Sequence, residues 1–472
     1  MDTLANRHGN DVTPDDETRH ARFPLFNFPP QAGERANERL REFCINLRSG
    51  SLAGIKRLDL SCGLTQFPAE IYDLADTLEI LNLSGNALST LPDDLPRLHK
   101  LRVIFCSDNQ FTEVPEVLGR CPMLEMIGFK ANKIDRLSGA ALPPALRWLI
   151  LTDNQLTEVP AEIGQCIRLQ KLMLAGNQLQ HLPEEMAACR NLELLRISAN
   201  RFESLPEWLM SLPRLAWLAF AGNPFVDVLE TASVAKQEIA HIHWHGIDLQ
   251  QKLGEGASGI IHQADWQTPE GATPVAVKLF KGAVTSDGLP KSEKAACLAA
   301  GIHPNLIPVT GKISGHPEGV AGLVMELIDA RFINLAGPPS LESCTRDIYP
   351  VGTAFSLSMV LAMAQGIASA AEQLHARGIM HGDLYAHNIL WDEQGDCLLG
   401  DFGAASFVPP AQGVALERIE VRAFACLLEE LLKRCSESTA ALWDLQRRCA
   451  QADVAARPLF AEIAKSLGNY LI

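Results

Sequence analysis

The first half of the chain repeats itself with a period of 23 residues, and this period constrains the fold more than any other feature. The pattern LxxLxLxxNxL, or a near variant, opens at Ile55, Leu78, Leu101, Leu124, Leu146, Leu169, Leu192 and Leu215. Successive openings are 23 residues apart, apart from one step of 22. One unit cannot bury its apolar face alone, whereas stacked units share a continuous core. The period therefore predicts a solenoid over residues 55–228.

Within a unit, the spacing of the conserved residue types predicts a short strand, a turn and a return segment. Leucines at 78, 81 and 83 alternate as a strand does, and Asn86 can hydrogen-bond backbone groups of the turn. A ladder of such asparagines is expected at Asn86, Asn109, Asn132, Asn154, Asn177, Asn200 and Asn223. The cysteines at leucine positions, Cys106, Cys121, Cys166 and Cys189, are expected to be small buried hydrophobes. These features resemble the leucine-rich repeat family, which implies an α/β solenoid.

The ends of the predicted solenoid need different descriptions. Residues 25–54 include the helical pattern ERANERLREFCINLRSG and are expected to cap the first repeat. Residues 1–24 are polar and aperiodic, which predicts disorder. At the other end, residues 229–242 form a boundary of mixed composition.

The strand positions that face away from the core are unusually apolar. A repeat array of this kind binds partners on that concave side, so a protein-docking face is predicted there. Its main residues are Phe105, Trp148, Ile150, Met173 and Trp217, accompanied by Ile80, Val103, Met126 and Leu194. The alternative is that the second half of the chain folds back and covers these positions.

Composition excludes some classes of protein. The net charge of -15 argues against nucleic acid as a main partner, because phosphate binding needs a basic surface. The 12 cysteines include no CxxC pair and no zinc-type spacing, so free thiols in a reducing compartment are expected. The N-terminus lacks a signal-peptide pattern, and no run of about 18 apolar residues occurs. These observations predict a cytoplasmic protein without a membrane span.

The second half carries six short motifs in a fixed order. They are the glycine-rich KLGEGASGIIHQADW, then PVAVKLF, SEKAACLAAGIHPNL, GLVMELI, HGDLYAHN and finally LLGDFGA. The glycines precede a strand pattern rather than a helix, which favours a hairpin over phosphates and disfavours a dinucleotide-binding turn. In this order the motifs resemble a eukaryotic-type protein kinase domain over residues 243–472. The resemblance implies a two-lobed α+β domain after the solenoid.

The resemblance also implies catalytic roles for individual residues. Lys278 would bind the α- and β-phosphates of ATP and pair with Glu293. Asp401 of DFG and Asn388 would hold Mg²⁺, and Asp383 would accept the proton of the attacking hydroxyl. A structural role is expected for His381.

Nucleotide contacts follow from the same resemblance. The backbone of the glycine-rich loop would approach the phosphates, and the strand before the hinge would present adenine contacts. The residues implied are Gly254, Gly256 and Gly259 for the loop, Met325 as gatekeeper, and Glu326 and Leu327 for the hinge.

Three departures from the family pattern bear on activity. Gly382 stands where an arginine usually precedes the catalytic aspartate. Kinases with that arginine use it to bind a phosphate on the activation loop, so activation by such a phosphate is not expected here. Tyr385 replaces a lysine that steadies the transferring phosphate and offers only a neutral donor, which predicts a slower enzyme. A packing or surface role is expected for His387, ahead of a role as a charged substitute for that lysine. Only nineteen residues separate Asp401 from Glu420, so the peptide platform is short, with Ser406 as its only hydroxyl side chain.

The motifs together predict a leucine-rich repeat protein kinase that uses ATP and Mg²⁺, with a lean towards Ser/Thr. The repeats would recruit a protein partner or substrate and raise its effective concentration. Two alternatives stay open: a nucleotide-binding pseudokinase scaffold, and a kinase of small molecules.

Overall fold

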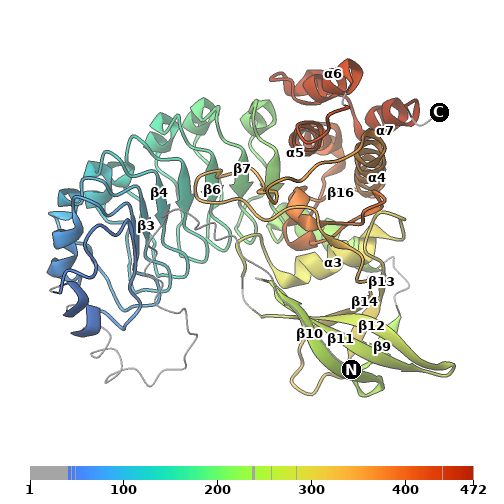
Figure 1. Ribbon diagram of the computed structural model, residues 1–472, viewed down its shortest axis with the longest axis horizontal. Coiled ribbons are helices and arrows are strands. Elements are labelled where there is room, and N and C mark those ends of the chain that lie inside the picture. The colour runs from blue at the N-terminus through green and yellow to red at the C-terminus, as the bar shows by residue number, and fades with distance from the viewer. Residues whose placement is uncertain are drawn as a thin grey trace, which may run out of the picture.

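The computed structural model describes residues 41–43, 45–47, 49–235, 240–256, 258–282, 284–437 and 439–470. Within this range the chain forms a curved repeat array and, beside its C-terminal end, a two-lobed domain (Figure 1). The predicted disorder of residues 1–24 and most of the predicted cap lie outside the described residues. Of the cap, residues 41–43 and 45–47 are helical.

The repeats form the predicted solenoid. Eight three-residue strands pair in parallel and in chain order, one from each repeat. They are β1 (Arg57–Asp59), β2 (Ile80–Asn82), β3 (Val103–Phe105), β4 (Met126–Gly128), β5 (Trp148–Ile150), β6 (Lys171–Met173), β7 (Leu194–Arg196) and β8 (Trp217–Ala219). The return segments on the convex side are short 3₁₀ turns, such as Ala161–Gln165 after Pro160. Because each repeat has one strand and one turn, stacking buries one continuous row of leucines.

The asparagine ladder is confirmed. In the fifth repeat the Asn154 Oδ1 accepts from the Ile134 amide at 3.0 Å, and its Nδ2 donates to the Phe129 carbonyl at 2.9 Å. The same side chain therefore satisfies buried backbone groups of two neighbouring repeats, as buried polar groups require. The four cysteines at leucine positions are also buried in this core, and burial raises the pKa of the Cys121 and Cys166 thiols to about 11.

Helix α2 (Pro224–Ala235) ends the array and leads into the smaller lobe of the second domain. That lobe is a six-stranded sheet in the order β10-β11-β12-β14-β13-β9, with helix α3 (Pro290–Ala300) beside it. The strands are β9 (His241–His243), β10 (Ile247–Glu255), β11 (Gly259–Thr268), β12 (Gly271–Phe280), β13 (Val309–Ser314) and β14 (Gly322–Glu326).

The larger lobe is mainly helical. Its helices are α4 (Leu357–Ala376), α5 (Gly413–Leu432), α6 (Ala440–Cys449) and α7 (Phe460–Gly468). Small sheets carry the intervening loops: β15 (Ile333–Asn334) with β17 (Ile389–Trp391) and β18 (Cys397–Leu399), and β16 (Ile379–Met380) with β19 (Ser406–Phe407). The two predicted fold classes, an α/β repeat solenoid and a two-lobed α+β domain, are both confirmed. Among the described residues, no helix combines the length and apolar character needed to cross a membrane.

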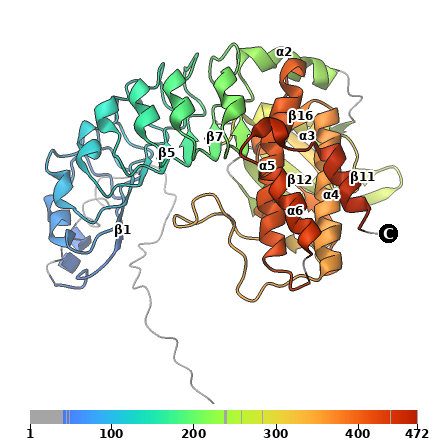
Figure 2. The same cartoon turned by 90° about the horizontal axis from the view of Figure 1, so that it is seen from above.

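The array and the larger lobe share their cores. Figure 2 shows, from above, α5 beside the last repeats. Trp217 and Leu194 of the repeats lie in the same buried cluster as Phe424 of α5. Trp217 is only 1% exposed. The alternative that the second domain covers part of the apolar face is therefore correct at Trp217 and Leu194, and the expectation that Trp217 is open to a partner is wrong.

A loop of the second domain covers more of the concave side. Residues 340–347 run across β6 and β7, where the Thr345 hydroxyl donates to Glu193 and the Arg147 guanidinium contacts the Glu342 carbonyl at 3.5 Å (Figure 1). Phe105, Trp148, Ile150 and Met173 stay partly exposed. The open part of the predicted docking face is therefore centred on β3 to β6.

Candidate active site

The glycine-rich segment forms the predicted hairpin. β10 and β11 pair antiparallel on either side of it, and the Gly256 amide donates to the Gly259 carbonyl at 2.9 Å. A Cβ at Gly254 or Gly256 would have no neighbour within 4 Å, whereas one at Gly259 would lie 2.5 Å from the Leu279 carbonyl. Gly259 is therefore required by the packing of β11 on β12, whereas the Cβ positions of Gly254 and Gly256 border open space.

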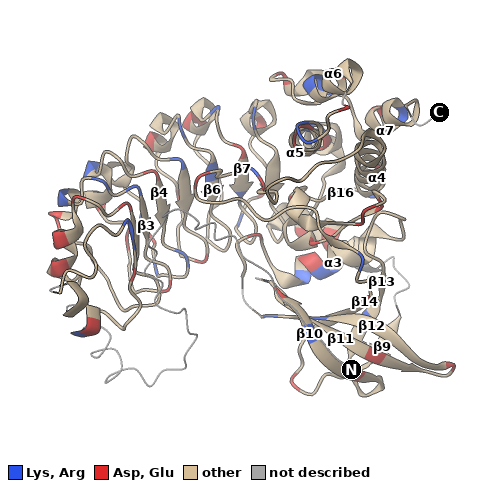
Figure 3. Ribbon diagram, in the orientation of Figure 1, with Lys and Arg blue, Asp and Glu red and all other residues tan. Residues whose placement is uncertain are grey.

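Lys278 on β12 and Glu293 on α3 form an ion pair between the sheet and the helix. Both side chains are buried, at 12% and 2% exposed. Burial lowers the pKa of the Lys278 ammonium, but Glu293 and Asp401 outweigh it and the pKa lies above its ordinary value. Lys278 is therefore a charged group held at the floor of the cleft. Figure 3 shows acidic and basic positions together on α3, the helix that carries Glu293.

The catalytic-loop motif brings Asp383 and Asn388 together, as the spacing predicts. The Asn388 Nδ2 donates to the Asp383 Oδ2 at 2.8 Å and to the Asp383 carbonyl at 2.9 Å. This orientation leaves the Asn388 Oδ1 as the group available to a ligand. Burial raises the pKa of Asp383, and the neighbouring Arg196 guanidinium opposes that rise.

His381 ties the catalytic loop to the DFG turn. Its ring is fully buried, its Nε2 lies 2.9 Å from the Gly400 carbonyl, and its Nδ1 lies 3.3 Å from the Asp383 amide. Phe402 packs beside it with ring centroids 5.1 Å apart. These contacts are structural, in agreement with the role expected for His381.

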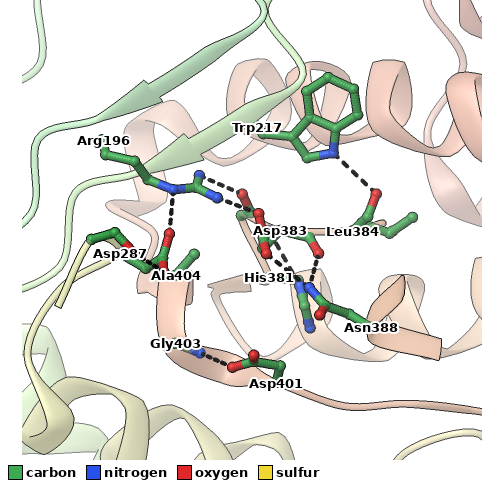
Figure 4. A network of polar contacts seen from close by, with 12 residues as sticks. Arg196, Trp217, Asp287, His381, Asp383, Leu384, Asn388, Asp401, Gly403 and Ala404 are labelled. Atoms are coloured by element: carbon green, nitrogen blue, oxygen red, sulfur yellow. Dashed lines mark hydrogen bonds and ion pairs between the residues drawn. The ribbon is translucent and has the colours of Figure 1, made fainter. Parts of the chain in front are cut away.

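Asp401 begins the DFG turn in a left-handed conformation, with φ 50°. Its Oδ1 accepts from the Gly403 amide at 3.1 Å (Figure 4), which fixes the carboxylate at the mouth of the cleft. Carboxylate and amide oxygens are the ligands that Mg²⁺ prefers, so Asp401 and Asn388 fit the metal. The described residues hold no cluster of three acidic, His or Cys side chains for a metal.

Glu420 on α5 anchors the backbone of the catalytic loop. Its Oε1 accepts from the Gly382 amide at 2.6 Å, and its Oε2 accepts from the His381 amide at 3.2 Å and lies 2.7 Å from the His375 ring. Burial raises the pKa of Glu420, but these donors outweigh burial and hold the pKa below its ordinary value. A glutamate therefore reaches the loop backbone from this helix.

A pocket between the lobes collects the nucleotide-site residues. Its lining includes Gly256, Gly259, Lys278, Glu293, Met325 and Asp401. Glu326 and Leu327 are not among its lining residues, and the Glu326 amide already donates to the Pro308 carbonyl at 3.1 Å. The Glu326 N–H is therefore engaged within the fold, and adenine contacts from the backbone at Glu326 and Leu327 stay a prediction.

Arg196 is the residue of this site that sequence reasoning missed. It comes from β7 of the repeats, where its guanidinium meets Asp383 of the catalytic loop and Asp287 of the loop before α3 (Figure 4). Its Nη1 also donates to the Gly382 carbonyl at 2.9 Å. The signal available in the sequence was a charged side chain at a concave-face position where most other repeats carry an apolar one.

Tyr385 does not take the place of a phosphate-binding lysine. Its ring stacks on Trp217 of β8, with centroids 4.1 Å apart and an interplanar angle of 5°. The Trp217 indole donates to the Leu384 carbonyl at 3.1 Å. The expectation that Tyr385 acts as a neutral donor in the cleft is therefore wrong, because its ring is used to pack the catalytic loop against the repeats.

His387 is also engaged elsewhere. Its Nδ1 lies 2.7 Å from the Asp347 Oδ1, and its amide donates to the Asp347 Oδ2 at 3.0 Å. Burial lowers the pKa of His387, but the contact with Asp347 outweighs burial and leaves the pKa above its ordinary value. The suggestion that His387 substitutes for the missing lysine is not supported, since its charge is paired with Asp347.

The segment after DFG is short and packs against the repeats. Helix α5 already begins at Gly413, twelve positions after Asp401, so little chain is left between the DFG turn and this helix. Ser406 is fully buried, and its hydroxyl accepts from the Phe220 amide of the last repeat at 3.0 Å. The one hydroxyl side chain of the segment is therefore inaccessible to a kinase in this structure.

Comparisons with known proteins agree with the two-part architecture. The family described as protein tyrosine and serine/threonine kinase matches residues 247–420. Leucine-rich repeat families match residues 144–202, 167–225 and 77–98.

Individual relatives are similar over part of their length. Serine/threonine-protein kinase Kist of Rattus norvegicus is 27% identical over 42% of this chain and 49% of its own length. Fibroblast growth factor receptor 1 of Pleurodeles waltl is 28% identical over 33% of this chain and 20% of its own length. A solved leucine-rich repeat protein of Leptospira interrogans is 28% identical, covering 38% of this chain and 52% of that one, with a TM-score of 0.35.

The chain spans less than half the length of either kinase relative. The matched family nevertheless covers the segment that carries the glycine-rich hairpin, Lys278, Asp383, Asn388 and Asp401. The repeat families cover the strands that support the catalytic loop. The chain therefore joins repeats similar to the leucine-rich repeat families to a segment, residues 247–420, similar to the protein tyrosine and serine/threonine kinase family.

Proposed function

We propose that the protein is an ATP- and Mg²⁺-dependent protein kinase that phosphorylates Ser or Thr. The observation that supports this most is the presence around one cleft of Lys278 paired with Glu293 and of Asp383 hydrogen-bonded to Asn388. Phosphoryl transfer depends mainly on positioning and charge neutralisation, which these groups supply. Ser/Thr kinases among the relatives favour the choice of hydroxyl.

Each residue has a defined task in this proposal. Lys278 binds phosphate oxygens, and Glu293 holds the lysine in place. Asn388 and Asp401 hold the Mg²⁺ that bridges the phosphates and neutralises charge developing during transfer. Asp383 accepts the proton of the attacking hydroxyl. The glycine-rich hairpin covers the phosphates, with open space beside Gly254 and Gly256.

The open part of the concave face is where we place the protein partner. Phe105, Trp148, Ile150 and Met173 are partly exposed there, and exposed apolar groups in one patch commonly mark interaction sites. Use of ATP and many buried free thiols fit a cytoplasmic location.

The test is incubation of the full chain with γ-labelled ATP and Mg²⁺, followed by analysis of label on the protein and on added protein substrates. Lys278→Met and Asp383→Ala should each lower labelling by at least about 100-fold. The matched control is Lys291→Met. Lys291 is a lysine near the start of α3 that is 61% exposed. Trp148→Glu should raise the KM for a protein substrate and leave kcat unchanged.

A nucleotide-binding scaffold is the second candidate. It is favoured by the fact that both Asp383 carboxylate oxygens already contact side chains of this chain, Arg196 and Asn388. Binding of ATP by the wild type with labelling no higher than that of Asp383→Ala would support the scaffold and reject the kinase.

A further inference from the structure

We propose that Arg196, a residue of the repeats, is a positioning residue of the kinase active centre that holds Asp383 in its working orientation. This inference rests on the proposed function, in which Asp383 accepts the proton of the attacking hydroxyl. It means that the seventh repeat completes the active centre and is more than a recruiting module.

Arg196 makes directed contacts with the catalytic loop. It is only 1% exposed, and its guanidinium reaches the Asp383 carboxylate, the Gly382 carbonyl at 2.9 Å and, through Nε, the Asp287 Oδ1 at 2.8 Å. A planar guanidinium fixes the direction of such contacts better than an ammonium does. Because it is buried, Arg196 acts through Asp383 and does not touch the substrate.

The contact is made while the rest of the cleft is assembled. The Lys278–Glu293 ion pair is formed, the Asn388 amide holds the other Asp383 oxygen, and His381 links the loop to Gly400. An arginine that disabled the site would be expected to displace one of these contacts. Asp383 also keeps 17% of its side chain exposed, while Arg196 is covered, so Arg196 supports the carboxylate from its protein side.

The glycine at position 382 of the catalytic loop allows the repeats to approach closely. Gly382 has φ 74°, and a Cβ there would lie 2.6 Å from the Leu218 carbonyl of β8. A side chain at Gly382 is therefore incompatible with the approach of the repeats. Where the family pattern has an arginine, the backbone of Gly382 instead meets a cation from another part of the chain, the Arg196 guanidinium.

Arg196 also links the two lobes. Asp287 precedes α3, and the residues around it pack on the repeats: a Cβ built at Gly288 would lie 3.1 Å from the Ser198 Cβ, and one at Gly222 would lie 2.9 Å from a Leu289 methyl. At the start of α3, the Ser292 hydroxyl donates to Glu230 of α2 at 3.0 Å. The repeats thus hold the helix that carries Glu293 as well as the loop that carries Asp383.

The experiment compares wild type, Arg196→Gln and Arg196→Lys, with Arg168→Gln as control because Arg168 is an arginine of the repeats that is 54% exposed. The readout is γ-phosphate transfer from MgATP, measured as kcat and as the KM for ATP, together with ATP affinity and thermal melting. Arg196→Gln should lower kcat by at least about tenfold and leave ATP affinity and the KM for ATP within about twofold. Arg196→Lys should recover part of the rate, and Arg168→Gln should match wild type.

A second comparison separates positioning from general damage. In an Asp383→Asn background, Arg196→Gln should cause no further loss of rate, since residues that act through each other are not additive. If Arg196→Gln does not fold, Arg196→Lys carries the same test. An unchanged kcat in Arg196→Gln and Arg196→Lys, or a rate increase, would overturn the role of Arg196 alone. Absence of transfer in the wild type would overturn the proposed function and this inference together.

Discussion

Gly382 is a residue whose identity is explained by another part of the chain. Its positive φ suits glycine, and a Cβ would lie 2.6 Å from both the Leu218 and the Ala404 carbonyl oxygens. Sequence comparison with the kinase pattern identified Gly382 as a departure but could not explain it, because the Leu218 carbonyl is 164 residues away in sequence. Lys278, Asp383, Asn388 and Asp401 were identifiable because each lies in a local motif.

Gly382→Ala should therefore lower the free energy of unfolding by more than the cost of placing an alanine in the left-handed conformation. The left-handed conformation costs about 1 kcal/mol for a residue with a Cβ, and forcing atoms into a packed site adds about 1–3 kcal/mol. Gly352→Ala is the matched control, since Gly352 has φ 83° with nothing within 4 Å of its Cβ position. Chemical denaturation measures both variants, and equal losses would contradict the predicted contact with the repeats.

At the scale of elements, β8 and the catalytic loop form one packed unit. Trp217 at the start of β8 stacks on Tyr385 and donates to the Leu384 carbonyl. The repeat period predicted the strand itself, because leucine spacing and the asparagine turn are local properties. It did not predict which concave-face side chains would be covered, since that depends on how a separate lobe docks.

Trp217→Ala should cost about 3–5 kcal/mol of unfolding free energy, which is typical for removing a large buried side chain. Trp148→Ala is the control, because Trp148 occupies the equivalent strand position three repeats earlier and stays partly exposed. Its loss should be less than half as large. Denaturation curves that give Trp148→Ala the larger loss would show that the lobe does not cover the last repeat.

At the scale of the whole molecule, the repeat array and the kinase-like domain share buried apolar side chains where they meet. Met380, Val408 and Leu416 belong to the same buried cluster as the repeat leucines, and Leu194, Ala216 and Trp217 belong to the cluster of the larger lobe. The two fold classes were predictable from period and motif order. Their shared core was not, because each set of signals describes only its own half.

The described parts should therefore unfold in one cooperative step. Calorimetry of the full chain is expected to show a single transition, because opening either part exposes apolar surface of the other. In Trp217→Ala the transition should broaden or divide as the coupling weakens. Two separate transitions in the wild type would contradict a shared core.

The hydrogen bond between the Phe220 amide and the buried Ser406 hydroxyl has a consequence for how such a protein can evolve. Domains joined by a linker can be exchanged between genes without loss of either activity. Here the Phe220 amide of the last repeat donates a hydrogen bond to the Ser406 hydroxyl in the segment after DFG. A different array grafted onto this domain would need a strand that ends at the same place. Recombination at the boundary is therefore constrained, and substitutions in the last two repeats and in the catalytic loop should be inherited as a set.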